Sequence, residues 1–381
     1  MQDNRKIRFA TLIYFLIFSM LFLATPQMTC AAQQSRSAAA KGKGFVNLVR
    51  EWNDRYLYSN GVINGKEILG YYTKDWATDT LSQTSLENNI GRITTVAAFS
   101  YVLTSSGEIT GESPTEALET AKANNIEIYA LVHNLTKSGF DRTLIHNVLS
   151  NSELSVKAVD SIYRCLVSNG FDGVNIDFEN VPSGDRQDLN DFMTLLKKKL
   201  APQGLKVTIS VPAKTSDNIN DGWSGAFDYE YLGGVADRIM LMTYDEHWIG
   251  GAPGPVASEP WVKNVITYSS VIIPRDKILL GIGNYGYDWI VGKGGCKAVP
   301  ANSALALAEK YGAVIEWDSY SQTPYFYYWE NGQKHVVWFE SPESAAFKMN
   351  LVNDYDLKGV ALWRLGFESW EFWDKVDKKL I

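Results

Sequence analysis

The feature of this sequence that most constrains its fold is a regular alternation of short, β-branched apolar segments with longer amphipathic ones. Eight segments have the character of strands: 67–72, 93–102, 126–133, 173–179, 206–211, 238–244, 277–284 and 359–363. Helical patterns lie between most of them: 114–124, 142–150, 155–169, 184–200, 229–235, 260–271 and 341–354. Strands that alternate with helices predict βαβ units and a parallel sheet. Eight such units in roughly 320 residues favour an α/β fold of the (β/α)8 TIM-barrel type over an open sheet.

One interval, at about 287–340, interrupts this alternation. It contains strand-like segments at 313–317, 324–330 and 335–339, and Asn331-Gly332 between the last two is a hairpin turn signal. We therefore expect a small β-rich (α+β) insertion between strand 7 and strand 8. Because barrel active sites are built from the loops that follow the strands, the insertion would raise one wall of a cleft.

The N-terminus has the pattern of an export signal. Three basic residues precede the uncharged apolar run FATLIYFLIFSMLFLA, and small residues follow at 30–32. We predict a signal peptide over 1–32, a polar linker over 33–43 and one globular domain over 44–381. Two alternatives stay open, an uncleaved segment that anchors the protein in the membrane and lipidation at Cys30. The chain would then be exported, either secreted or associated with the cell envelope or spore.

Charge and cysteine content narrow the possible partners. The formal net charge is −7, and because the first 32 residues contribute +2 the remainder carries −9. This excludes nucleic acid and anionic lipid, which both need a basic face. Cys165 and Cys296 are far apart in the sequence and lack metal-type spacing. The two thiols of an exported chain could pair, but nothing in the sequence requires it, and we expect buried free thiols. We predict no metal, no cofactor and a monomer.

The fourth predicted strand carries a row of polar residues. In the segment FDGVNIDFEN, side chains alternate between two faces. One face holds Val174, Ile176 and Phe178, and the other holds Gly173, Asn175, Asp177 and Glu179. The apolar face can pack against helices, so the polar face must point into the barrel. Buried polar groups need partners and buried charges need more, so such a row indicates function.

The last two carboxyl groups of this row suggest acid chemistry. Glu179 stands at the mouth of the strand, and Asp177 lies one pleat below it. Two carboxylates that lie so close cannot both ionise freely, so the pKa of one of them rises. A shared proton would let Glu179 protonate a leaving group near neutral pH. A buried carboxylate network without chemistry and a cation site are the alternatives.

The segment D-G-V-N-I-D-F-E resembles the D-G-x-D-x-D-x-E signature of glycoside hydrolase family 18, which contains chitinases and related N-acetylglucosaminidases. The resemblance implies a TIM barrel and retaining hydrolysis in which the substrate's 2-acetamido oxygen, not a protein nucleophile, attacks the anomeric carbon. It implies that Glu179 is the general acid and base and that Asp177 orients the acetamido group. Asp172, which matches the first Asp of the signature, would be structural.

Asn175 departs from the signature, where the middle residue is Asp. The change removes one charge beneath Asp177 and leaves the acid in place. It bears on how Asp177 and Glu179 share a proton, and so on the pH optimum. Family members with Asn here occur among bacterial spore and cell-wall N-acetylglucosaminidases.

Further segments extend the resemblance over roughly 64–381. The segment RIMLMTYDEHW resembles the M-x-Y-D element of the sixth strand. The resemblance implies that Tyr244 bonds the acetamido oxygen and that Met242 and Asp245 contact the sugar in the −1 subsite. The segments DEHW and GAPGPVAS are similar to the spore-associated branch. Trp363 matches the Trp beneath the −1 sugar, and Tyr72 is expected to line the cleft.

The third strand is a poor match to the family, because ALVHN at 130–134 replaces the usual S-x-G-G element. This weakens the likeness to ordinary chitinases. The resemblance favours hydrolysis of β-1,4-linked N-acetylglucosamine-containing glycan, with peptidoglycan of the cell wall or spore cortex as the polysaccharide substrate. A chitinase is the alternative, and a non-catalytic chitin- or peptidoglycan-binding protein is a third hypothesis.

Overall fold

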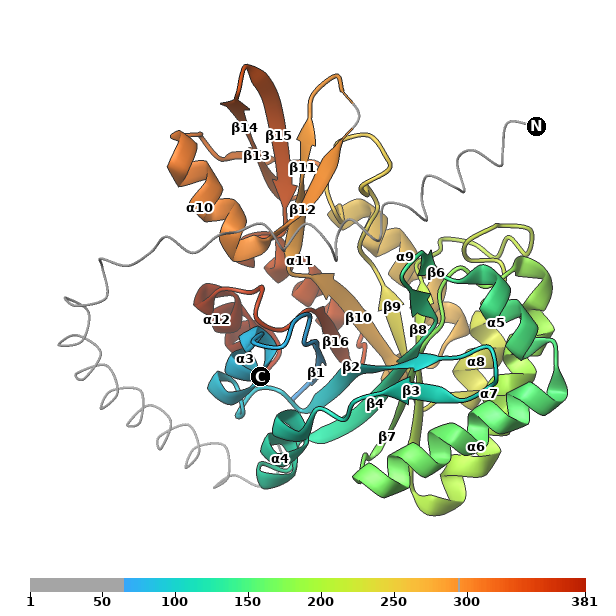
Figure 1. Ribbon diagram of the computed structural model, residues 1–381. Coiled ribbons are helices and arrows are strands. Elements are labelled where there is room, and N and C mark those ends of the chain that lie inside the picture. The colour runs from blue at the N-terminus through green and yellow to red at the C-terminus, as the bar shows by residue number, and fades with distance from the viewer. Residues whose placement is uncertain (1–64, 294) are drawn as a thin grey trace.

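The centre of the molecule is a closed parallel β-barrel (Figure 1). The computed structural model describes residues 65–293 and 295–381. The expected signal peptide, the expected linker and residues 44–64 of the expected globular domain therefore lie outside the described residues. The barrel strands are β1 (Glu67–Tyr72), β2 (Thr95–Leu103), β4 (Glu127–His133), β7 (Gly173–Asp177), β8 (Lys206–Pro212), β9 (Arg238–Met242), β10 (Ile278–Gly283) and β16 (Gly359–Trp363). They pair in the order β1-β16-β10-β9-β8-β7-β4-β2, and β1 also pairs with β2, which closes the barrel. The predicted TIM barrel is confirmed, with the ends of its strands within two residues of those expected.

Helices form the outer layer of the barrel (Figure 1). They are α3 (Leu81–Asn88), α4 (Thr115–Ala123), α5 (Arg142–Leu149), α6 (Ser152–Asn169), α7 (Arg186–Leu200), α8 (Tyr229–Val235), α9 (Glu259–Ile272), α11 (Pro342–Asp354) and α12 (Trp370–Lys379). The seven expected helices are present, whereas α3 and α12 were not expected. Short additional strands are β3 (Ile109–Gly111), β5 (Leu135–Thr136) and β6 (Gly139–Phe140), and 3-10 turns cover Ser183–Asp185, Ala201–Gln203 and Arg275–Lys277.

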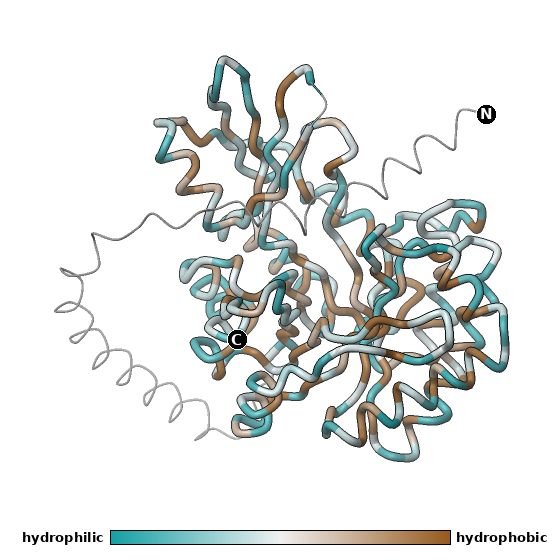
Figure 2. The backbone as a smooth tube through the Cα atoms, viewed as in Figure 1, coloured by the Kyte–Doolittle hydropathy of each residue, from teal (hydrophilic) through white to brown (hydrophobic). Residues whose placement is uncertain are grey.

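Helix α6 shows how local sequence sets these boundaries. The Asn151 side chain caps its start by accepting hydrogen bonds from the backbone N–H groups of Glu153 and Leu154. Gly170 ends it in the left-handed conformation, with φ of 72°. An N-cap of this kind stabilises a helix by about 1 kcal/mol. Figure 2 shows hydrophobic and hydrophilic residues alternating along the outer helices, as expected where one face packs against the barrel.

Two apolar layers hold the barrel together. The larger layer lies between strands and helices and includes Val174, Ile176 and Phe178 of the β7 segment. A separate, smaller cluster fills the interior of the barrel: Leu69, Tyr71, Ala97, Tyr129, Leu131, Met240, Leu279 and Ala361. The apolar face of the β7 segment therefore packs on the helices, as its alternation predicted. Its polar face points into the barrel.

The interval between β10 and β16 forms a second sheet, which is the predicted β-rich insertion. Its elements are β11 (Tyr285–Ile290), β12 (Cys296–Pro300), α10 (Ala301–Tyr311), β13 (Glu316–Asp318), β14 (Thr323–Glu330) and β15 (Gln333–Phe339). The strands pair in the order β12-β11-β15-β14-β13. Asn331 and Gly332 join β14 to β15 with φ of 51° and 73°, as the hairpin signal predicted. The expected segment at 313–317 forms a strand only at Glu316–Asp318, and β11, β12 and α10 were not expected.

The opposite end of the barrel is closed by an ion pair. Arg238, at the start of β9, donates from Nε to a Glu67 carboxylate oxygen at 2.7 Å. Glu67, at the start of β1, is buried. The ion pair lies at the N-terminal ends of the strands, whereas the polar row of β7 reaches the C-terminal ends. One end of the barrel therefore holds a carboxylate that is paired with a cation, and the other end receives the polar row of β7.

Candidate active site

The β7 segment delivers two buried carboxyl groups to the mouth of the barrel. The strand ends at Asp177, which pairs in register with His133 of β4. Glu179 follows two residues later, and Asn180 then turns the chain away with φ of 57°. Asp177 and Glu179 are only 5% and 8% exposed. Two acids are thus held next to each other with little access to water.

Burial makes both carboxyl groups bind protons more tightly. It raises the pKa of Asp177 to about 7, against the opposing effect of the Ser210 hydroxyl. Burial also raises the pKa of Glu179 well above its usual value, and the charges of Asp177 and Asp245 add to this shift. The pair therefore retains a proton near neutral pH. A protonated carboxyl at a mouth of this kind can act as a general acid.

Asn175 lies one pleat below Asp177 in a fully satisfied, neutral network. Its Nδ2 donates to Thr208 Oγ1 at 3.1 Å and faces the Met240 sulfur at 3.5 Å. Its Oδ1 accepts a hydrogen bond from Ser210 Oγ at 3.1 Å. The Tyr71 hydroxyl is 2.8 Å from the same Ser210 oxygen. Because Asn175 has no exposed surface, it supports the site from beneath.

Tyr244 and Asp245 follow the end of β9. Burial raises the pKa of Tyr244 well above 10, with further contributions from Tyr71 and from Asp177 and Glu179. The Tyr244 hydroxyl therefore keeps its proton at any ordinary pH. Asp245 adopts φ of 62°, and its Oδ1 accepts hydrogen bonds from Tyr285 at 2.5 Å and Tyr287 at 2.7 Å. Both tyrosines belong to β11, so the insertion holds this carboxylate in place.

Aromatic side chains gather around Trp363 at the barrel mouth. Trp363, the last residue of β16, packs edge-on against Tyr71 at 5.3 Å and Phe99 at 5.8 Å. The peptide bond between Trp363 and Arg364 is cis. Met242 ends β9 beside Pro212 of β8, and its alternation with Met240 directs it into the barrel. The predicted residues at 175, 177, 179, 242, 244, 245 and 363 thus converge on one mouth.

The structure corrects the expectation for Tyr72. Tyr72 packs in the layer between strands and helices, where the charges of Glu116 and Asp79 reach it. Tyr71 faces the interior instead. Strand β1 is buried on both of its faces. Its sequence therefore shows no polar–apolar alternation that could tell which of the two tyrosines faces the interior. The tyrosine of β1 that points into the barrel is therefore Tyr71.

Several residues at the mouth were not expected from the sequence. They are Tyr71, Phe99, His133, Ser210, Tyr285 and Tyr287. His133 stacks on Phe99 at 4.1 Å, and burial lowers its pKa to about 3. Its Nδ1 accepts a hydrogen bond from the backbone N–H of Leu135 at 3.1 Å. The available signal was strand alternation, since Ser210 and His133 stand at the inward positions of β8 and β4.

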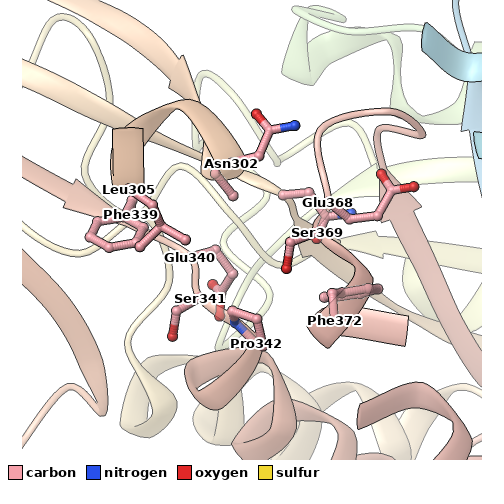
Figure 3. Close-up of a pocket in the computed structure, with 11 residues that line it drawn as sticks. Asn302, Leu305, Phe339, Glu340, Ser341, Pro342, Glu368, Ser369 and Phe372 are labelled. Atoms are coloured by element: carbon pink, nitrogen blue, oxygen red, sulfur yellow. The ribbon is translucent and has the colours of Figure 1, made fainter. Parts of the chain in front are cut away.

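A separate hollow lies between the insertion and the C-terminal helix. Figure 3 shows its lining, which comes from α10, the end of β15 and the start of α12. Among the residues that the structure describes, three of its polar atoms have no hydrogen-bond partner: Asn284 Nδ2, Glu368 Oε2 and Ser369 Oγ. None of the predicted site residues lines this hollow, so it is not part of the candidate site.

Within residues 65–293 and 295–381, no group of three or more His, Cys, Asp or Glu residues is placed to hold a metal ion. In the same ranges no helix combines the length and apolarity needed to cross a bilayer. Cys165 and Cys296 are free thiols, each partly exposed instead of fully buried as expected.

Known proteins resemble this chain over most of its length. It is 33% identical over 327 residues to the uncharacterized glycosylase YvbX of Bacillus subtilis, covering 85% of this chain and 94% of that protein. It is 32% identical over 292 residues to the cortical fragment-lytic enzyme of Bacillus cereus, covering 74% of this chain and 66% of that protein. The chain thus spans just under two thirds of that second relative.

A solved structure shares both fold and sequence. The chitinase from Chromobacterium violaceum superposes with a TM-score of 0.77 at 31% identity, covering 83% of this chain and 99% of that one. The family model described as glycosyl hydrolases family 18 matches residues 67–368, which include the barrel, the insertion and both carboxyl groups. The chain therefore belongs to glycosyl hydrolase family 18 and is a glycoside hydrolase.

Proposed function

We propose that this glycoside hydrolase cleaves β-1,4-linked N-acetylglucosamine-containing glycan of peptidoglycan, in the cell wall or spore cortex, with retention of configuration. The observation that carries the proposal is the buried pair of Asp177 and Glu179 at the mouth of the barrel. The pair can supply an acid near neutral pH. The name of the cortical fragment-lytic relative supports the choice of polysaccharide.

In the proposed mechanism Glu179 gives its proton to the glycosidic oxygen as the bond to the anomeric carbon breaks. The substrate's own acetamido oxygen bonds to that carbon and forms an oxazolinium ion, so no protein nucleophile is needed. Asp177 orients the acetamido group and balances its positive charge. Glu179 then takes a proton from the water that opens the ring and returns to its acid form.

The remaining residues of the mouth hold the sugar. Tyr244, which keeps its proton because burial raises its pKa, donates a hydrogen bond to the acetamido oxygen. Trp363 forms a flat apolar floor for the sugar ring, and Met242 and Asp245 line the −1 subsite. Asn175 contributes from beneath through Ser210 and Thr208, and Tyr71 takes the place expected for Tyr72.

Replacement of the acid tests the mechanism. We expect Glu179→Gln to lower kcat by on the order of 10²–10⁴-fold, because Gln fills the same space and cannot give up a proton. Glu309→Gln is a control, since Glu309 is exposed on α10, and it should leave turnover unchanged. Equal activity of wild type and Glu179→Gln would disprove the assignment. Retained glycan binding without turnover in the variant would support it.

Chitin hydrolysis is the second candidate function, and the likeness to the Chromobacterium violaceum chitinase favours it. Purified peptidoglycan and chitin oligomers should be digested side by side and their products identified by mass. Release of N-acetylglucosamine reducing ends from peptidoglycan supports the first proposal. Release of reducing ends from chitin alone would replace it with the second.

The same proposal implies an exported, monomeric enzyme that acts on a polysaccharide in the spore or cell wall. The name of the cortical fragment-lytic relative supports association with the spore. Fractionation of cells and spores with an antibody against the barrel tests the location. Enzyme found only in the cytoplasmic fraction would contradict it.

A further inference from the structure

The β-ladder that holds β7 stops before it reaches Glu179. The last paired residues of β4 and β7 are His133 and Asp177. Glu179 lies two residues further on, beyond the strand. Its main chain therefore needs another partner, because a buried N–H or C=O group without one is costly.

The side chain of Asn134, the next residue after β4, supplies that partner. Its Nδ2 donates to the Glu179 carbonyl oxygen at 2.8 Å. Its Oδ1 accepts from the Glu179 backbone N–H at 2.9 Å. A primary amide has the same donor and acceptor as a peptide group, so Asn134 continues the ladder by one step with its side chain. Asn134 has no exposed surface, which shields both bonds from water.

We infer that Asn134 is a positioning residue for the general acid, an inference that rests on the proposed role of Glu179. The two hydrogen bonds fix the main chain of Glu179 from a neighbouring strand, so that its carboxyl group meets the glycosidic oxygen at a constant place. The pair His133-Asn134 belongs to the segment ALVHN, which replaces the usual third-strand element of the family. Asn134, the second residue of this pair, would thus position the general acid.

Loss of the two hydrogen bonds between the Asn134 side chain and the Glu179 main chain should affect the chemical step more than substrate binding. Asn134→Ala leaves the N–H and C=O of Glu179 without their partner and lets the acid shift. A misplacement of about 1 Å can lower turnover by on the order of 10²-fold. Asn134 acts on the main chain, not on the sugar, so KM should stay within about twofold of wild type.

A purely structural role is the competing explanation, because Asn134 Nδ2 also lies 3.3 Å from the Asp141 carbonyl oxygen. Asn89 provides a matched control. It is buried, its Nδ2 donates to the Ser85 carbonyl at 2.8 Å, and its Oδ1 accepts from Arg92 at 3.2 Å. It follows α3 in the outer layer, so Asn89→Ala should lower stability without moving Glu179.

The experiment measures kcat, KM and thermal unfolding for Asn134→Ala, Asn134→Asp and Asn89→Ala on the glycan that the wild type cleaves. We expect kcat of Asn134→Ala to fall by about 10- to 100-fold, with kcat of Asn89→Ala unchanged. Asn134→Asp keeps the acceptor but turns a second carboxyl oxygen toward the Glu179 carbonyl at a fully buried position, so it should lose kcat at least as much as Asn134→Ala. It also tests the inference if Asn134→Ala does not fold. Equal losses of kcat in the Asn134 variants and Asn89→Ala would overturn the inference.

A double-variant cycle separates this inference from the proposed function. In a Glu179→Gln background, Asn134→Ala should cause little further loss, because the acid that it positions is already gone. The same fold loss in both backgrounds would overturn the inference. Full activity of Glu179→Gln would instead disprove the proposed function. Loss in Glu179→Gln combined with wild-type kcat in the Asn134 variants would disprove only the positioning role.

Discussion

At the residue scale, the site combines two acids with a neutral amide beneath them. Asn175 offers its donors to Thr208 and Met240 and its acceptor to Ser210. Asn175 adds no charge to the site. Burial raises the pKa of both Asp177 and Glu179, and the charges of Asp177 and Asp245 raise that of Glu179 further. A carboxyl group in place of Asn175 would change these pKa values.

We expect Asn175→Asp to move the alkaline limb of the pH–rate profile upward by about one pH unit. An added negative charge beneath Asp177 favours the protonated forms of the pair, so the acid is lost at higher pH. Asn175→Ser disturbs the same hydrogen bonds without charge and should leave the limb in place. The profile of kcat against pH measures this, and a downward shift in Asn175→Asp would contradict it.

At the element scale, strand β9 carries an ion pair at its start and leads into proposed site residues at its end, as is common in barrels of this kind. Strand β9 begins with Arg238, which pairs with Glu67. It ends with Met242, and Tyr244 and Asp245 follow. The two groups of residues lie at opposite ends of the barrel, so changes at the start of β9 should alter stability alone.

Arg238→Met tests this separation. The substitution leaves the buried Glu67 carboxylate without its cation, which should lower the free energy of unfolding by roughly 2–3 kcal/mol, less than for a fully buried pair. Urea unfolding measures the loss, and kcat should stay near the wild-type value at temperatures where the variant is folded. Arg238→Lys keeps the charge and should lose less. A fall in kcat of tenfold or more in the folded variant would refute the separation.

Elements with clear periodicity could be predicted from the sequence, and elements without it could not. All eight barrel strands and seven helices followed from alternation. Helix α10 buries only Ala304 and Ala308, which are too small to produce an apolar stripe. The same limit applies to the site. Asp177 and Glu179 could be predicted from a local pattern of alternation. The hydrogen bonds between the Asn134 side chain and Glu179 could not, because they join residues that are 45 positions apart.

At the scale of the whole molecule, ionisation of the buried Asp177 carboxyl group opposes folding. Asp177 has a pKa of about 7 in the folded chain, against about 3.9 in an unfolded one. Because the pKa of Asp177 is higher in the folded chain, the free energy of unfolding is highest below the unfolded pKa, where the group is protonated in both states. It falls as pH rises toward 7, because the unfolded chain then gives up the proton more readily than the folded one.

Asp177→Asn should therefore be more stable than wild type at pH 8 and nearly equal to it at pH 4. The amide removes the cost of ionising a buried carboxyl group. If Asp177 has its proposed role, the same change should lower activity, since active sites are often optimised at the expense of stability. Denaturant unfolding at both pH values measures the difference. A variant that is less stable than wild type at pH 8 would contradict the prediction.

The two hydroxyl groups that β11 extends to Asp245 have an evolutionary consequence. An insertion that lay above the barrel mouth without contacting the site residues could be lost or exchanged between homologues as a module. This one supplies both tyrosines that bind the Asp245 carboxylate, so its removal would leave Asp245 without those two donors. The first strand of the insertion and the β9 loop are thus expected to be inherited together. Grafting a different insertion onto this barrel will require Tyr285 and Tyr287 to be kept.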